Sequence, residues 1–156
     1  MRAIPESMER VGAEIAATVA AFPDSDSKWS WLLKLAKAHP AMADEYRNEK
    51  FLVRGCATRL YLAPVFENGR LWFETDTDAG DASPLIVRGL ADLAQRLYSG
   101  QRPSDILAFD PEFFRKTGIH GALSATRANG FASLLRQIRL YAEAYARLEA
   151  LGEAGK

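Results

Sequence analysis

The feature that most constrains the fold is the Asn68-Gly69 pair between two short runs rich in β-forming residues, 60–65 and 71–75. Asn-Gly readily takes the positive φ angles of a tight hairpin turn, so the two runs are predicted to pair as strands. A third such run lies at 51–53, and the connections are too short for parallel crossovers. The middle of the chain therefore predicts a small three-stranded antiparallel sheet.

The segments before this sheet have the apolar period of helices. One stripe consists of Met8, Val11, Ile15, Val19 and Phe22, and the next of Trp29, Leu32, Leu33 and Ala36. Asp24 is placed to cap the second helix, and Pro40 is placed to end it.

The segments after the sheet return to the helical period. Gly89 inside the first of these helices costs about 1 kcal/mol relative to alanine, which indicates either close packing there or tolerated sequence drift. Asp110-Pro111 is predicted to start a short helix, and Ser124 to cap a long final one. The apolar stripes of the first and last helices are Ile86, Leu90, Leu93 and Leu97, then Leu134, Ile138, Tyr141, Tyr145 and Leu148. Helices at both ends of a small antiparallel sheet predict an α+β fold, as a single domain over residues 1–156.

The composition argues against several classes of partner. Lys plus Arg and Asp plus Glu each total 20, so the chain lacks the basic surplus typical of nucleic-acid binding. No apolar run approaches the ~18 residues needed to span a membrane, and residues 1–10 lack the apolar core of a signal peptide. The single cysteine cannot form an internal disulfide, which fits a reducing cytosol. We therefore expect a cytoplasmic protein with no nucleic-acid or membrane partner.

That single cysteine, Cys56, is the candidate reactive group. Gly55 precedes it in a short break between apolar strand residues, so the backbone can turn there and leave one side open. Arg54 and Arg59 bracket the cysteine, and a nearby cation favours the thiolate, which is the nucleophilic form. A buried structural cysteine is about equally compatible with these local features, because free cysteine is often buried.

The two histidines do not form a metal site by spacing. His39 and His120 are far apart in the sequence, and we expect each to be a surface or loop residue. Two histidines and one cysteine are too few for a structural zinc site built from these residue types alone. The sequence therefore predicts no resident metal or cofactor.

Several short blocks resemble the SufE/CsdE family. Arg54-Gly55-Cys56 is similar to the Gly-Cys loop of that family, and the Arg-Ala-Asn-Gly block at 127–130 is similar to the element that opens its last helix. The other similar blocks are 32–35 with Pro40, 45–47, 76–79, 86–90, 97–100 and 105–111. Together they keep the family order over roughly residues 20 to 145.

The chain departs from the family pattern at a few positions. Ala57-Thr58 stands where the family often has Gln-Ser, and Tyr61 stands where it usually has Trp. Ala125-Thr126 replaces a Pro-Ser pair, and an extra stretch lies at about 80–85. The cysteine and the arginine of the family pattern keep their places.

The resemblance implies a sulfur-acceptor protein with the α+β fold shared with IscU-type scaffolds. SufE proteins receive persulfide sulfur on the loop cysteine, here Cys56, from a PLP-dependent cysteine desulfurase of the SufS or CsdA type. They stimulate that enzyme and deliver sulfur to iron–sulfur cluster assembly on a downstream scaffold. They are not autonomous enzymes and carry no cofactor beyond the transient persulfide. Supporting roles at the loop or the partner surface are expected for Gly55, Arg54, Arg59, Asp78 and Arg127.

Three other functions remain compatible with the fold or with the cysteine. An iron–sulfur scaffold would need several ligands, usually thiolates, and this chain has one cysteine. A thiol redox sensor or peroxidase would oxidise Cys56 to a sulfenic acid, and turnover with peroxide would reveal it. In a binding module with a structural cysteine, Cys56→Ser would leave stimulation of the partner intact.

Overall fold

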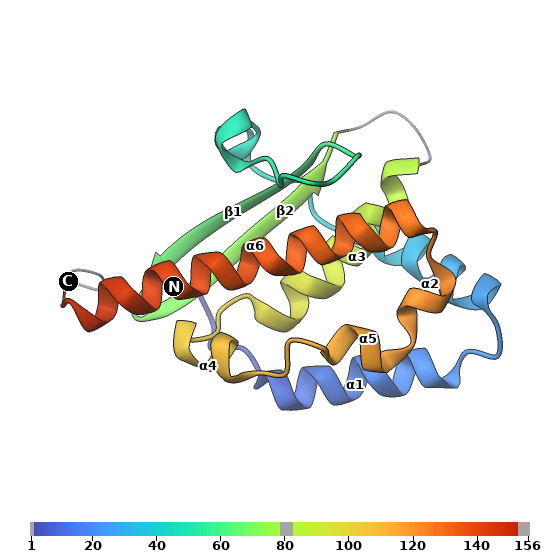
Figure 1. Ribbon diagram of the computed structural model, residues 1–156, viewed down its shortest axis with the longest axis horizontal. Coiled ribbons are helices and arrows are strands. Elements are labelled where there is room, and N and C mark those ends of the chain that lie inside the picture. The colour runs from blue at the N-terminus through green and yellow to red at the C-terminus, as the bar shows by residue number, and fades with distance from the viewer. Residues whose placement is uncertain (1, 79–82, 153–156) are drawn as a thin grey trace.

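The computed structural model describes residues 2–78 and 83–152 (Figure 1). Its strands are β1 (Leu60–Glu67) and β2 (Arg70–Thr77), and short 3₁₀ turns lie at η1 (Asp44–Tyr46), η2 (Glu49–Phe51) and η3 (Ile119–Ala122). The helices are α1 (Met8–Ala21), α2 (Ser25–Ala38), α3 (Ser83–Tyr98), α4 (Pro103–Ala108), α5 (Phe113–Thr117) and α6 (Ala125–Ala150). The predicted α+β fold, with helices around a small antiparallel sheet, is confirmed.

The hairpin has the predicted turn. β1 and β2 pair antiparallel from Leu60 opposite Thr77 to Glu67 opposite Arg70. Asn68 and Gly69 connect them with φ angles of 52° and 76°. Two consecutive positive φ angles match the right-handed twist of paired strands, which is why Asn-Gly is favoured at this point.

The predicted third strand at 51–53 is wrong, because the described residues contain a sheet of two strands. Asn48 caps the 3₁₀ turn η2 by accepting a hydrogen bond from the Lys50 N–H at 3.0 Å, so the chain is coiled up to Phe51. Gly55 then turns the backbone with a φ of 84°. Between these two turns only Leu52 forms a bridge, to Tyr61, and the segment is too short to continue as a strand.

α3 is the central helix of the core. It contacts β2, α1, α2 and α6, and its predicted apolar stripe is at most 1% exposed: Ile86, Leu90, Leu93 and Leu97. A Cβ atom on Gly89 would overlap the carbonyl oxygen of Leu32 and lie 3.0 Å from its carbonyl carbon. Close packing between α2 and α3 therefore explains a glycine inside a helix, as the sequence suggested.

The terminal helices largely follow their predicted stripes. Asp24 accepts a hydrogen bond from the Ser27 N–H at 2.8 Å and starts α2, and Ser124 accepts one from the Arg127 N–H at 3.3 Å and starts α6. Leu134 and Ile138 are buried as predicted, whereas Leu148 is 37% exposed. The inner-face prediction fails at Leu148 because the last turns of α6 extend past the end of the hairpin (Figure 1).

The middle of the second half needs smaller corrections. The short helix predicted from Asp110-Pro111 begins at Phe113, and α4 was not predicted. The side chain of Asp110 accepts a hydrogen bond from the Glu112 N–H at 2.9 Å and so shapes the turn before α5. Residues 80–82 of the extra stretch at 80–85 lie outside the described residues, and residues 83–85 form the start of α3.

His39 lies in the loop after α2, as predicted, but it is a buried core residue and not a surface residue. It is 5% exposed, and its Nδ1 atom lies 2.8 Å from the Asp92 carboxylate on α3. Its Nε2 atom lies 2.7 Å from the carbonyl oxygen of Thr75 on β2. His39 follows the last residue of α2, where the chain passes between α3 and the sheet, and both ring nitrogens are satisfied there. His120, in η3, is half-buried.

A buried carboxylate ties the end of β2 to the helices. Asp76 is 2% exposed and accepts hydrogen bonds from Arg88 Nε on α3 at 2.7 Å and from the Met42 N–H at 2.9 Å. Arg47 also pairs with Asp76. Burial alone would raise the pKa of Asp76, but the Met42 and Arg88 hydrogen bonds outweigh it and lower the pKa.

Candidate functional site

Cys56 lies on a loop, residues 54–59, between the Leu52 bridge and β1. Gly55 enters this loop in the left-handed conformation, with a φ of 84°. A Cβ atom there would also lie only 2.8 Å from the Ser133 hydroxyl oxygen. Glycine is therefore required twice over at position 55, by the backbone angle and by the close approach of α6.

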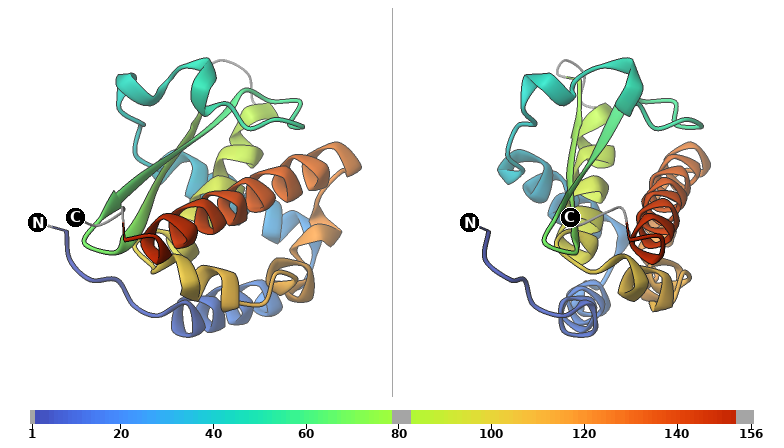
Figure 2. Two further views of the ribbon diagram at one scale, coloured as in Figure 1. Left: turned by 60° about the vertical axis from the view of Figure 1, so that its left-hand side comes forward. Right: turned by 90° about the vertical axis from the view of Figure 1, so that its left-hand side faces the viewer.

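The loop is seated on α6. The Ser133 hydroxyl donates a hydrogen bond to the Gly55 carbonyl oxygen at 3.2 Å. One helical turn earlier, a Cβ atom on Gly130 would lie 2.9 Å from the Cys56 sulfur, so the thiol rests against bare helix backbone. Figure 2 shows the loop above the first half of α6 in both views. A glycine and a serine spaced one turn apart thus form the seat for the Cys56 loop.

Cys56 and Arg127 line one pocket of about 360 Å³. Its other lining residues are Ala57, Thr58, Val87, Ser124, Thr126 and Gly130. The guanidinium carbon of Arg127 lies 4.9 Å from the centroid of the Trp29 ring, which is a cation–π contact between α6 and α2. This contact holds the charge of Arg127 beside the cysteine pocket.

The far end of the loop is tied to the end of β2. Arg59 Nε lies 2.9 Å from the Asp78 carboxylate, and the Asp78 N–H donates to the Arg59 carbonyl oxygen at 3.4 Å. Arg47 lies 3.7 Å from the same carboxylate. Arg54 is exposed and does not line the cysteine pocket. Of the other sequence-selected residues, Cys56 and Arg127 line the pocket, Gly55 is seated on α6, and Arg59 and Asp78 brace the loop.

Comparison with known proteins gives the family. The SufE family model, described as an Fe-S metabolism associated domain, matches residues 13–142. The chain belongs to the SufE family.

Individual relatives agree with this assignment. An uncharacterized SufE-like protein of Rhizobium etli is 36% identical over 121 residues, which is 74% of this chain and 78% of the relative. The sulfur acceptor protein CsdE of Escherichia coli is 31% identical over 123 residues, which is 78% of this chain and 80% of the relative.

A solved structure shares the fold. The solution structure of a hypothetical protein from Thermus thermophilus aligns with a TM-score of 0.69 at 18% identity, covering 86% of this chain and 94% of the other. At that identity the likeness concerns the fold alone.

The electrostatic environment of Cys56 in this SufE-family chain differs from the sequence-based expectation. Burial raises the pKa of the Cys56 thiol, and a hydrogen bond from the Thr58 backbone acts in the opposite direction. The expected lowering by Arg54 and Arg59 is wrong for this conformation. Arg59 is paired with Asp78 and Arg54 is exposed, and neither cation offsets the effect of burial on this pKa.

Sequence reasoning missed the residues that hold the loop from behind. Ser133 was not considered, and Gly130 was noted only as part of a motif. The available signal was a glycine and a serine three residues apart inside a long helix, since small residues at that spacing mark a close approach of backbone. Trp29 was assigned to the core stripe of α2, and the structure adds its contact with Arg127.

Within residues 2–78 and 83–152, no group of three or more His, Cys, Asp or Glu side chains is arranged to hold a metal ion. Within the same ranges, no helix combines the length and the apolar character needed to cross a membrane.

Proposed function

We propose that this chain accepts persulfide sulfur on Cys56 from a PLP-dependent cysteine desulfurase and passes it toward iron–sulfur cluster assembly. The observation that carries the proposal is the placement of the chain's single cysteine on a glycine-turned loop, in a pocket shared with Arg127. Membership of the SufE family and the likeness to the E. coli sulfur acceptor CsdE support the same role.

The transfer step needs one thiolate. Cys56 thiolate attacks the outer sulfur of the persulfide on the desulfurase cysteine, and a new sulfur–sulfur bond forms on Cys56. The sulfur–sulfur bond of the enzyme breaks, and the enzyme cysteine leaves as a thiolate. The exchange is balanced without any external oxidant or reductant, and no metal or PLP lysine is required of the acceptor.

The resting site does not favour that attack. Cys56 is half-buried against Gly130, and burial raises its pKa, so the thiolate fraction near neutral pH is small. We expect docking of the desulfurase to draw the loop away from α6. This step would break the hydrogen bond between Ser133 and Gly55 and remove the burial that raises the pKa.

Arg127 is the residue best placed to assist sulfur transfer to Cys56. Its contact with Trp29 fixes it at the pocket wall, where its remaining N–H groups can bind an anionic group of the partner or the persulfide. Arg59 and Asp78 anchor the opposite end of the loop, so they limit how far it can swing. In this proposal Arg127 is a positioning residue, and Cys56 alone forms the new bond.

The redox-sensor and iron–sulfur scaffold alternatives gain no support from the site. A redox sensor works best with an exposed thiol of lowered pKa, whereas the pKa of Cys56 is raised. An iron–sulfur scaffold needs several ligands, and Cys56 is the single thiol of the chain. The proposal also includes a desulfurase partner of the SufS or CsdA type, stimulation of that desulfurase by this chain, and a downstream iron–sulfur scaffold.

Mass spectrometry of the acceptor tests the proposal. The protein is incubated with a cysteine desulfurase and cysteine, then measured without reductant. Wild type should gain about 32 Da, one sulfur atom, and Cys56→Ser should gain none. Ser30→Ala, an exposed change on α2, serves as the matched control and should label like wild type. Equal labelling of Cys56→Ser, or no labelling of wild type by SufS- and CsdA-type enzymes, would refute the assignment.

A further inference from the structure

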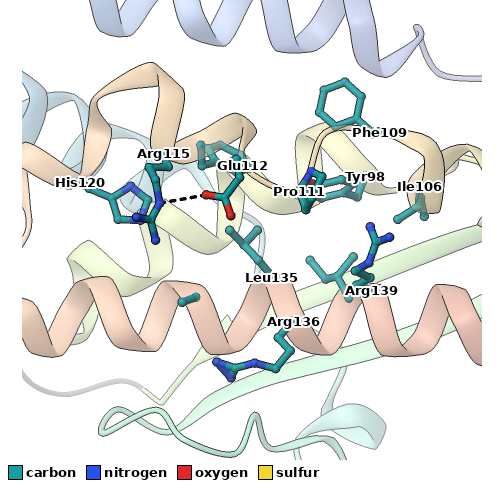
Figure 3. A pocket seen from close by; sticks show the side chains of 13 residues that line it. Tyr98, Ile106, Phe109, Pro111, Glu112, Arg115, His120, Leu135, Arg136 and Arg139 are labelled. Carbon is teal, nitrogen blue, oxygen red and sulfur yellow. Dashed lines mark ion pairs between the residues drawn. The ribbon is translucent and has the colours of Figure 1, made fainter.

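A second pocket lies on the opposite side of α6 from Cys56. It encloses about 300 Å³ between α6 and the segment of α4 and α5 (Figure 3). Leu135, Ile138 and Arg139 line it from α6, whereas Gly130 and Ser133 hold the cysteine loop. At about 3.6 residues per turn, these two sets of positions fall on opposing faces of the helix. The second pocket is therefore separate from the sulfur-acceptor site.

The pocket wall is mainly apolar. Tyr98, Ile106 and Phe114 contribute its inner side, and Leu135 points into it from α6 (Figure 3). At the mouth, Arg115 pairs with Glu112 at 2.9 Å. An apolar wall with a few convergent polar groups is the usual composition of a small-molecule site, and 300 Å³ is at the small end of the range.

One polar atom of this wall is buried without a protein partner. The Nδ1 atom of His120 is fully buried and has no hydrogen-bond partner within residues 2–78 and 83–152. Buried polar groups are nearly always hydrogen-bonded, so the wall has hydrogen-bonding capacity that the described residues do not use. Tyr98, which is 7% exposed, lines the same wall.

A cation lies beside the Tyr98 hydroxyl. Figure 3 shows the guanidinium of Arg139 directed from α6 toward Tyr98 and Ile106, whereas Arg136 points to the other side of the helix. Arg139 donates one hydrogen bond, to the Leu107 carbonyl oxygen at 3.2 Å, which leaves other N–H groups for a ligand. Burial raises the pKa of Tyr98 to about 12, so its hydroxyl stays a donor at neutral pH.

We propose that this pocket binds a small carboxylate with an apolar body, the carboxylate accepting from Arg139 and Tyr98 and the body packing on Leu135 and Ile138. The guanidinium fork suits the two oxygens of a carboxylate. The hydroxyl of Tyr98 donates to an acceptor, and the apolar wall suits a hydrocarbon body. The proposal is independent of the sulfur chemistry at Cys56.

The probe is 3-phenylpropionate, titrated into the full ¹⁵N-labelled chain and followed by two-dimensional NMR. We expect a dissociation constant on the order of 1 mM, with shifts centred on the residues that line the pocket. The matched probes 3-phenylpropionamide and 3-phenylpropylamine keep the body and change the charge. Each should bind at least about tenfold more weakly than the acid.

Variants separate the proposed contacts from general folding effects. Tyr98→Phe removes only the hydroxyl and Arg139→Gln only the charge, and each should weaken the acid at least about fivefold. Arg147→Gln, an exposed change on the same helix, should leave binding unchanged. Tyr98→Phe preserves the shape of the core, so it decides the question if Arg139→Gln proves unstable.

Several results would overturn the proposal. One is the absence of pocket-centred shifts with the acid, and another is equal binding of acid, amide and amine, which would mean a purely apolar cavity. Undiminished binding to Tyr98→Phe would also remove its basis. If a peptide with an acidic side chain shifts the pocket residues while the acid does not, the small-molecule proposal fails.

Discussion

Replacing Gly130 with alanine should push Cys56 out of its seat on α6. A Cβ atom at position 130 would lie 2.9 Å from the Cys56 sulfur, whereas ordinary contacts begin near 3.4 Å. The helix backbone cannot yield easily, but among the described residues the cysteine loop is joined to α6 by a single hydrogen bond, from Ser133. The sulfur should therefore move outward by about 0.5 Å or more, and the loop should loosen.

The expected magnitude comes from two opposing terms. Alanine in place of glycine inside a helix stabilises by about 1 kcal/mol, and the contact with the sulfur removes part or all of that gain. In a Cys56→Ala background the sulfur is gone, so Gly130→Ala should then give the full ~1 kcal/mol. Urea unfolding of the four proteins measures the coupling between the two positions.

Thiol reactivity is the second readout. A sulfur released from its seat loses part of the burial that raises its pKa, so its pH midpoint for alkylation should fall. At pH 7.5, iodoacetamide should modify Gly130→Ala about threefold faster than wild type or more. Gly121→Ala is the matched control, because a Cβ atom there meets nothing within 4 Å. If a folded Gly130→Ala protein showed an unchanged alkylation rate and an unchanged pH midpoint, the proposed packing of Cys56 on Gly130 would be refuted.

Three further predictions test other parts of the structure. Gly89→Ala should destabilise the fold by at least about 2 kcal/mol in urea unfolding, because the new Cβ overlaps the Leu32 carbonyl; a neutral effect would contradict the α2–α3 packing. The pKa of Asp76 is lowered in the folded state, so its ionisation stabilises the fold above its usual pKa of 3.8, and this stability is lost as pH falls through the lowered value. The difference in unfolding free energy between wild type and Asp76→Asn should therefore narrow from pH 7 to pH 3. A constant difference would count against the assignment. Arg127→Ala should raise the desulfurase concentration needed for half-maximal sulfide release about fivefold to tenfold, with little change in melting temperature. The control Arg147→Ala, at an exposed position, should leave that concentration unchanged. Identical titrations of the two variants would leave Arg127 without a role in docking.

Local rules predicted the elements whose causes are local. Asn68-Gly69 identified the hairpin because its positive φ angles depend on those two residues. Asp24 and Ser124 identified helix starts because a cap acts within three residues. The predicted strand at 51–53 failed because a capped turn before it and a left-handed Gly55 after it left room for one bridge.

The candidate site was only partly accessible to sequence reasoning. Cys56 is the chain's single cysteine, so it could be selected without a structure. The raised pKa of Cys56 could not be predicted, because the burial that causes it depends on Gly130. Gly130 is far from Cys56 in the sequence and reaches the sulfur only through the packing of α6. The burial of His39 has the same origin, since Thr75 and Asp92 become its partners only in the folded chain.

A seated cysteine of raised pKa is consistent with the proposed sulfur carrier. Thiolate is the form that reacts with oxidants, alkylating agents and disulfides, so a protonated thiol packed against α6 is protected while the protein is free. The same burial would slow sulfur transfer if the cysteine loop could not move. Among the described residues, the hydrogen bond from Ser133 to Gly55 is the one that holds the loop on α6. Ser133 is therefore expected to set the balance between protection and reaction. Ser133→Ala should speed alkylation of Cys56 in the free protein and leave the maximal rate of desulfurase-driven labelling close to wild type, because the docked partner breaks that bond in any case. If Ser133→Ala slowed labelling and left alkylation unchanged, the serine would act on the transferring state, and the seat would not be a protective device.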